Sequence, residues 1–294
     1  MKPDEKSTQK KSDWISIGIF VVICFVLALA PAPYVFQEDG GNELLSYVLV
    51  YMISFSPMIA CVVTRLVTKE GFHDGVFMPH FHGNAKVYVL AVLIPLLMGV
   101  AGAYVMGGIL RTRVGFDPET SANMQLAGFL LQSVMIYPNL FFLLGEEVGW
   151  RAFLYDKLDR QLGVHGSLLV GGCIWGLWHA APIYYEGINF GKDYPGYPYV
   201  GILLMCVMCC FFGALLQWLR KKSGSMLPAL LAHAVVDTMI PYIMTSLLTP
   251  EVVNDNIFMF GAVGVLIPSV IGGIPCWILL ARDSKKRQNR ENPV

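Results

Sequence analysis

The chain is too apolar for an ordinary soluble protein. Its 294 residues are 55% hydrophobic and only 14% charged, whereas an average soluble domain has roughly 25% charged residues. The formal net charge of zero gives no reason to expect nucleic acid as a partner. The composition therefore predicts an integral, multi-pass membrane protein, located in the plasma membrane if the source is a prokaryote.

Long stretches with few or no charges divide the chain into membrane-crossing helices. A helix needs about 20 residues to cross the hydrocarbon core of a bilayer, and about eight stretches reach that length. We therefore predict an all-α fold, a polytopic transmembrane helical bundle of about eight spans. The predicted spans are residues 14–37, 44–64, 87–110, 120–145, 161–185, 194–219, 223–250 and 256–281.

Lys and Arg are distributed unevenly over the two sides of this bundle. An even number of spans puts both termini on one side, and every Lys and Arg except Arg111, Arg113 and Lys192 then falls on that side. By the positive-inside rule, both termini are cytoplasmic. The expected organisation is a cytoplasmic N-terminal tail (1–13), a single transmembrane domain (14–281) and a cytoplasmic C-terminal tail (282–294), with both tails disordered or surface-bound.

The longest connection on the outer side, residues 184–199, is rich in Tyr and Gly. Tyrosine side chains favour the interface between lipid and water, where the ring lies in lipid and the hydroxyl meets the headgroups. The sequence therefore favours an interfacial anchor over a cap on a substrate site.

Two adjacent glutamates lie within an apolar stretch that continues past them to Lys157. On a rise of about 1.5 Å per residue, Glu146 lies roughly 15–20 Å from that boundary. An ionisable residue in a span is destabilising by roughly 2.5–3.5 kcal/mol, and such groups usually face a bundle interior or a cavity. Glu147 and Arg151 are four residues apart, which predicts an ion pair on one helix face, while Glu146 points elsewhere as a free carboxylate.

Later spans add two histidines and an aspartate at comparable depth. His179 lies in the predicted fifth span and His233 in the seventh. Asp237 follows His233 by four residues, so the aspartate can hold one ring nitrogen and fix the tautomer of the imidazole. Trp175 precedes His179 by the same spacing and is expected to form a wall beside it.

These side chains allow two kinds of chemistry. In the first, Glu146 is the general base that activates a water, His179 orients the water, and protonated His233 stabilises the oxyanion. In the second, Glu146, His179 and His233 bind one divalent metal, zinc before others, with an open position for water. A purely structural role, in which the polar side chains cross-link helices, stays open as well.

Three short motifs carry a resemblance to a known family. They read Glu-Glu-x-x-x-Arg at 146–151, Trp-x-x-x-His at 175–179 and His-x-x-x-Asp at 233–237. Together they resemble the type II CAAX proteases and bacteriocin-processing enzymes, the CPBP or Abi family of intramembrane proteases. That family has Glu-Glu-x-x-x-Arg, Phe-x-x-x-His and His-x-x-x-Asn or Asp on successive helices. The resemblance covers residues 141–238, about a third of the chain.

The resemblance implies roles for four residues. Glu146 and His179 would activate the water, while His233 and Asp237 would assist at the oxyanion, with or without a metal. Trp175 stands in place of the usual Phe, a change that reshapes the pocket. Asp237 stands where prenyl-protein proteases tend to have Asn, and an ionised aspartate cannot donate a hydrogen bond. This last departure argues against a prenylated-protein substrate.

We therefore hypothesise an intramembrane endopeptidase, of the glutamate type or a metallo-endopeptidase. Its partners would be the lipid bilayer and a membrane-associated polypeptide, namely a leader or secreted peptide, a bacteriocin-related peptide or a CAAX-type substrate. The alternative is a non-catalytic membrane binding or immunity protein that uses the same polar cavity. A proton- or ion-coupled transporter is a third possibility, because buried carboxylates and histidines also build proton relays.

Overall fold

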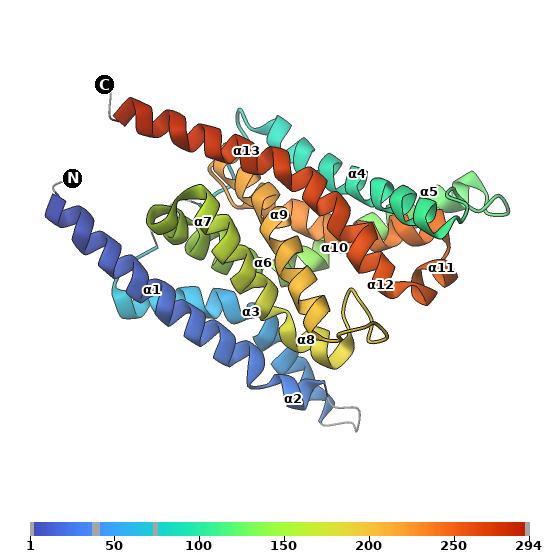
Figure 1. The fold of residues 1–294 in the computed structure, drawn as a ribbon, viewed down its shortest axis with the longest axis horizontal. Coiled ribbons are helices and arrows are strands. Elements are labelled where there is room, and N and C mark those ends of the chain that lie inside the picture. Colours follow the sequence, from blue (N-terminus) through green and yellow to red (C-terminus); the bar gives the residue numbers. More distant parts are fainter. Residues whose placement is uncertain (1–2, 37–41, 73–75, 292–294) are drawn as a thin grey trace.

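The computed structural model describes residues 3–36, 42–72 and 76–291, and every regular element in these ranges is helical (Figure 1). This confirms the all-α prediction for the described part of the chain. Two of the elements, η1 and η2, are π-helical. In chain order the elements are α1 (Pro3–Leu29), α2 (Ala32–Val35), α3 (Glu43–Thr68), α4 (Ala85–Leu110), α5 (Ala122–Val134), α6 (Ile136–Gly149), η1 (Trp150–Leu154), α7 (Tyr155–Trp178), α8 (Ala180–Glu186), α9 (Tyr199–Ser223), α10 (Leu227–Leu248), α11 (Pro250–Asp255), α12 (Ile257–Met259), η2 (Phe260–Val265) and α13 (Leu266–Glu291).

Seven segments of the described chain are long and apolar enough to cross a membrane. The fourth of them, Ala122–Glu186, has 65 residues and contains two of the predicted spans. The helix direction changes within it at Gly163, whose φ of 68° is a conformation that glycine adopts without steric cost. The polytopic helical bundle is thus confirmed. The first turn of α1 and the last turn of α13 lie at the same end of the bundle (Figure 1), and their cytoplasmic location stays a prediction.

The predicted span 120–145 is divided into two helices, α5 and α6, at Met135. Pro138 explains the division, because a proline ring clashes with the carbonyl four residues earlier and offers no amide hydrogen. That carbonyl belongs to Val134, where α5 ends. No residue of α5 is buried, whereas the last turn of α6 is buried. Only α6 therefore contributes to the core.

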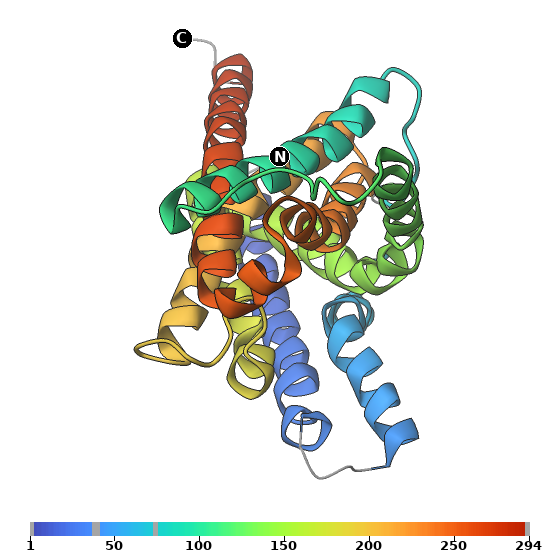
Figure 2. The same ribbon diagram turned by 90° about the vertical axis from the view of Figure 1, so that its right-hand side faces the viewer.

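The core of the bundle lies around α9 and α10, with α4 on one side and α1 and α3 on the other (Figures 1 and 2). α10 packs against α4, α6 and α9, and α7 packs against α9. A Cβ atom at Gly172 would lie 2.5 Å from the Cα of Cys210, and one at Gly176 would lie 2.4 Å from the Cα of Cys206. Small residues at such crossings let two helix backbones approach closely. The close crossing holds the end of α7, where His179 follows, against α9.

Both predicted tails are helical where the structure describes them. α1 begins at Pro3, and α13 continues to Glu291. Disorder is not found in these described stretches, which hold Lys, Glu, Gln and Arg, residues that favour helix, and no Gly or Pro within 4–13 or 282–291. Their location at a surface stays a prediction. Asp13, placed at the end of the N-terminal tail, is itself only 1% exposed.

Ion pairs at one end of the bundle connect three helices. Lys221 of α9 pairs with Asp159 of α7, and Lys222 pairs with Asp283 of α13 at 3.0 Å. Charged residues of three helices that are far apart in the sequence therefore meet at this end of the bundle.

Candidate active site

The two glutamates lie in the last turn of α6, directly before η1. Glu146 is 8% exposed, and Glu147 and Arg151 are fully buried. Glu147 Oε2 lies 3.2 Å from Arg151 Nε, so the predicted ion pair is present. The Arg151 guanidinium also lies 4.3 Å from the ring centre of Trp175 and 4.9 Å from that of Tyr155. The arginine is thereby fixed on three sides, and with it Glu147.

Glu146 is held by two indole groups. Trp175 Nε1 donates a hydrogen bond to Glu146 Oε2 at 2.7 Å, and Trp150 Nε1 donates to the same oxygen at 3.3 Å. Hydrogen bonds to an ionised acceptor are roughly twice as strong as neutral ones. Trp175 is thus a hydrogen-bond donor to the candidate base as well as the wall that the sequence predicts. Its ring centre lies 6.0 Å from that of His179.

His233 is oriented mainly by Glu147. Its Nδ1 lies 2.8 Å from Glu147 Oε1, whereas its Nε2 lies 3.8 Å from Asp237 Oδ2. The second distance is too long for a hydrogen bond, so the prediction that Asp237 holds one ring nitrogen is not met by a direct bond. Glu147 reaches the ring from the facing helix α6, while the Asp237 side chain is 43% exposed and lines the neighbouring cavity.

His179 lies between α7 and α8, where the chain leaves regular helix. Its Nδ1 lies 2.9 Å from the carbonyl oxygen of Trp175. A carbonyl only accepts hydrogen bonds, so Nδ1 carries the hydrogen and Nε2 has the free lone pair. Trp178 contacts the His179 ring edge-on, with 4.8 Å between ring centres, and donates its own indole N–H to Ser56 at 3.0 Å. The imidazole is therefore fixed in both tautomer and orientation.

A cavity of about 310 Å³ brings the four predicted catalytic residues together. They are Glu146 from α6, His179 from the end of α7, and His233 and Asp237 from α10. Phe212, Met205 and Cys209 of α9 contribute apolar walls. The cavity thus combines a carboxylate, two imidazoles and a second carboxylate with surfaces that suit an apolar substrate.

Two residues of the cavity come from a segment that the sequence assigned to another role. Ile188 and Asn189 lie in the connection 184–199 and line the cavity. The connection can pack inward because Gly261 of η2 has no side chain. A Cβ atom at Gly261 would lie 2.1 Å from the carbonyl oxygen of Asn189. This connection is therefore part of the site, and its role as an interfacial anchor stays a prediction.

The side chains as they lie do not form a three-ligand metal set. Within the described ranges, no three His, Cys, Asp or Glu side chains are grouped so that they could hold one ion. Glu146 Oε2 already accepts two N–H groups, and His233 Nδ1 is bound to Glu147. A divalent metal held by Glu146, His179 and His233 stays a prediction.

Similarity to known proteins covers the part of the chain that contains the three motifs. A family model described as type II CAAX prenyl endopeptidase Rce1-like matches residues 128–239, the range that contributes all four catalytic candidates. The chain is also similar to CAAX prenyl protease 2 of Methanococcus maripaludis, with 26% identity over 155 residues. Over this range the chain resembles the CPBP family. The match covers 49% of this chain and 54% of the relative, so the chain spans about half the length of the curated relative that it matches.

Sequence reasoning missed the contribution of Trp150 to this candidate site. Trp150 lies four residues after Glu146, the spacing at which side chains on one helix meet. An indole N–H that is fully buried needs an acceptor, and Trp150 is 0% exposed. The spacing and the buried environment were therefore signals that could have found this contact.

Proposed function

We propose that this protein is an intramembrane endopeptidase of the CPBP type that hydrolyses a peptide bond near the carboxyl end of a membrane-associated polypeptide, with CAAX-type substrates first. The observation that carries the proposal is the single cavity that Glu146, His179, His233 and Asp237 line among apolar helices. The family match and the relative named as a CAAX prenyl protease support the substrate class. They outweigh the argument from Asp237 against a prenylated substrate.

Glu146 would act as the general base. Its Oε2 accepts both indole N–H groups, which leaves Oε1 to receive a proton from water. His179 Nε2, with its free lone pair, would hold the second hydrogen of that water. The water oxygen bonds to the carbonyl carbon of the substrate, and the resulting oxyanion needs a donor. His233 in its protonated form offers Nε2–H for this role, while its Nδ1–H remains on Glu147.

Collapse of the tetrahedral intermediate breaks the carbon–nitrogen bond. The proton that Glu146 took from water then passes to the leaving amine, so the enzyme returns to its starting state. Asp237, 3.8 Å from His233 Nε2, would stabilise the imidazolium by charge rather than by a hydrogen bond. The walls formed by Phe212, Met205 and Cys209 would exclude bulk water and contact apolar parts of the substrate.

The test uses purified protein in lipid nanodiscs and synthetic farnesylated peptides that end in a CAAX sequence. Mass spectrometry should find a new carboxyl terminus with wild type and none with Glu146→Gln. Glu119→Gln, a matched change in an exposed loop residue, should cleave as wild type does. Cleavage retained by Glu146→Gln would overturn the assignment of the base. Tight binding without cleavage by wild type would favour the non-catalytic binding protein.

The same assay tests whether cleavage depends on a divalent metal. Dialysis against a zinc chelator should leave cleavage unchanged if the reaction proceeds as written. Loss of cleavage that added zinc restores, with the dialysed protein still folded, would favour the metallo-endopeptidase instead. A parallel set of unprenylated leader peptides separates CAAX-type substrates from secreted or bacteriocin-related ones.

A further inference from the structure

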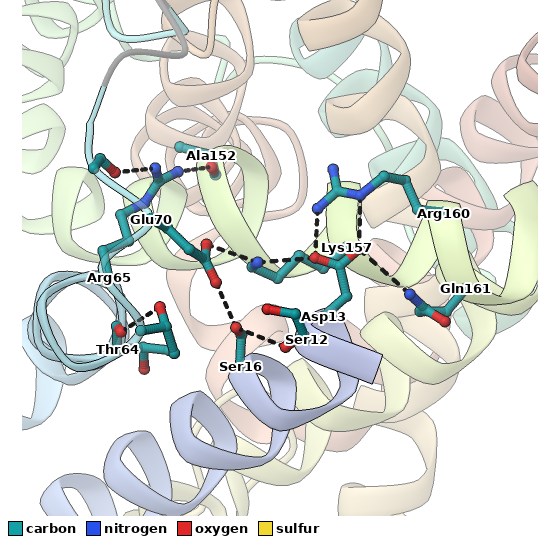
Figure 3. A network of polar contacts seen from close by, with 12 residues as sticks. Ser12, Asp13, Ser16, Thr64, Arg65, Glu70, Ala152, Lys157, Arg160 and Gln161 are labelled. Carbon is teal, nitrogen blue, oxygen red and sulfur yellow. Dashed lines mark hydrogen bonds and ion pairs between the residues drawn. The ribbon is translucent and has the colours of Figure 1, made fainter. Parts of the chain in front are cut away.

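Arg65 lies near the end of α3 and connects that helix to the segment that follows the two glutamates. It is only 7% exposed. Its Nη2 donates to the carbonyl oxygen of Ala152 in η1 at 3.1 Å, and its Nη1 donates to the carbonyl oxygen of Gly71 at 2.8 Å (Figure 3). The guanidinium also lies over the rings of Phe72 and Phe153, 5.6 and 5.5 Å from their centres.

The π-helical segment η1 sets the direction in which the glutamates face. In η1 the amide of Tyr155 bonds to the carbonyl of Trp150, five residues earlier, so one turn holds one residue more than in an α-helix. At 3.6 residues per turn, one extra residue rotates everything beyond it by about 100°. If η1 relaxed to an α-helix, Glu146 and Glu147 would rotate by about that angle relative to α7. The indole of Trp175 on α7 would then no longer meet Glu146.

Contacts from other helices hold this rare conformation. Arg65 gives the η1 backbone a hydrogen-bond donor from α3. Phe153 of η1 is packed between Arg65, the Lys157 ammonium at 4.9 Å and the ring of Phe20, which stacks on it at 5.1 Å. Because π-helical turns are rare and frequently occur at functional sites, such external support indicates a conformation that the protein needs.

A neighbouring cluster of charges ties the same helices together without touching the η1 backbone. Lys157 Nζ lies 2.7 Å from Glu70 and 3.1 Å from Asp13, and Arg160 Nε lies 2.8 Å from Asp13 (Figure 3). These are contacts between side chains of α1, α7 and the segment after α3. They offer a control, because a change at Arg160 weakens the helix connection while the bond between Arg65 and Ala152 remains.

We propose that Arg65 is a positioning residue of the active site. By binding the carbonyl oxygen of Ala152 it holds η1 in its π-helical form, and η1 in turn holds Glu146 and Glu147 toward His179 and His233. The expected effect on kcat rests on the proposed function. The expected effect on the η1 backbone can be measured by hydrogen–deuterium exchange without any activity.

The experiment compares wild type, Arg65→Gln and Arg160→Gln in lipid nanodiscs. Two readouts are taken: hydrogen–deuterium exchange of the amides in residues 150–157, and kcat and KM for a farnesylated CAAX peptide. Arg65→Gln should lose protection in 150–157 and lower kcat by about tenfold or more, with KM within about twofold, since a small misplacement of catalytic groups costs rate rather than binding. Arg160→Gln should lower the melting temperature and leave both readouts near wild type.

Unchanged protection of residues 150–157 in folded Arg65→Gln would overturn the proposal, as would an unchanged kcat. Equal losses in Arg65→Gln and Arg160→Gln would also overturn it, because they would show a general loss of stability. If Arg65→Gln is not recovered folded, Arg65→Met replaces it under the same criteria, since methionine keeps packing between the two phenylalanine rings and has no donor. If wild type cleaves no peptide, the proposed function fails while the exchange data still decide the role of Arg65.

Discussion

Replacing Arg151 with methionine should destabilise the protein by several kcal/mol. Arg151 and Glu147 are both fully buried and form a 3.2 Å ion pair, and removal of one partner from such a pair costs about 3–5 kcal/mol. The lost contacts of the guanidinium with Trp175 and Tyr155 add about 2 kcal/mol. Since many domains have a stability of about 5–15 kcal/mol in total, Arg151→Met should be poorly folded in detergent.

The double variant Glu147→Gln with Arg151→Met tests the cause. It leaves no uncompensated carboxylate, and the new amide oxygen can still accept from His233 Nδ1. Unfolding by SDS in mixed micelles should therefore show the double variant to be more stable than Arg151→Met alone. Arg113→Met, a change of the same type at an exposed loop residue, should be neutral. The reasoning is refuted if the double variant is as unstable as the sum of its two single changes.

Two further predictions follow from the contacts around the site. Trp175→Phe removes the N–H group that donates to Glu146 at 2.7 Å, and a hydrogen bond to a charged group contributes about 1.5–3 kcal/mol. The kcat for the CAAX peptide should therefore fall about ten- to a hundredfold, while circular dichroism shows intact helices. An unchanged kcat would mean that this bond does not orient the base. Burial raises the pKa of Glu70, but hydrogen bonds from Lys157 and Ser16 outweigh it, and the pKa lies below its ordinary value of 4.5. A lowered pKa gives stability that is present above the ordinary value and is lost as pH falls through the folded value, so the melting temperature of wild type should drop more steeply below about pH 4.5 than that of Glu70→Gln. Parallel curves for the two proteins would contradict this.

Contacts within one helix were predictable from the sequence. The pair of Glu147 and Arg151 follows from four-residue spacing alone, because that spacing fixes which side chains share a face. The burial of Glu146 is likewise expected from the apolar residues that continue past it. These inferences need only the local geometry of a helix, and the structure confirms the ion pair and the burial. The depth of Glu146 in the membrane stays a prediction.

Contacts between helices were not predictable in the same way. Trp175 and Glu146 are 29 residues apart, and His233 and Glu147 are 86 apart. Whether they meet depends on how each helix is rotated about its own axis, which a single sequence leaves free. The π-helical turn η1 adds a further rotation of about 100° between the glutamates and α7. The sequence of Trp150–Leu154 contains no pattern that predicts a π-helical turn.

The family that this chain resembles usually has Phe where this chain has Trp175, and this difference changes how the carboxylate of Glu146, the proposed base, is held. A phenylalanine at this position would offer the wall but no N–H, and Glu146 would keep only the 3.3 Å bond from Trp150. With both indoles on Oε2, the carboxylate is fixed and Oε1 receives no hydrogen bond from any residue of the described ranges. Ile188 and Asn189 line the same cavity without bonding to Glu146. Exchange of those two side chains should therefore alter KM between peptides without the uniform loss of kcat expected for Trp175→Phe.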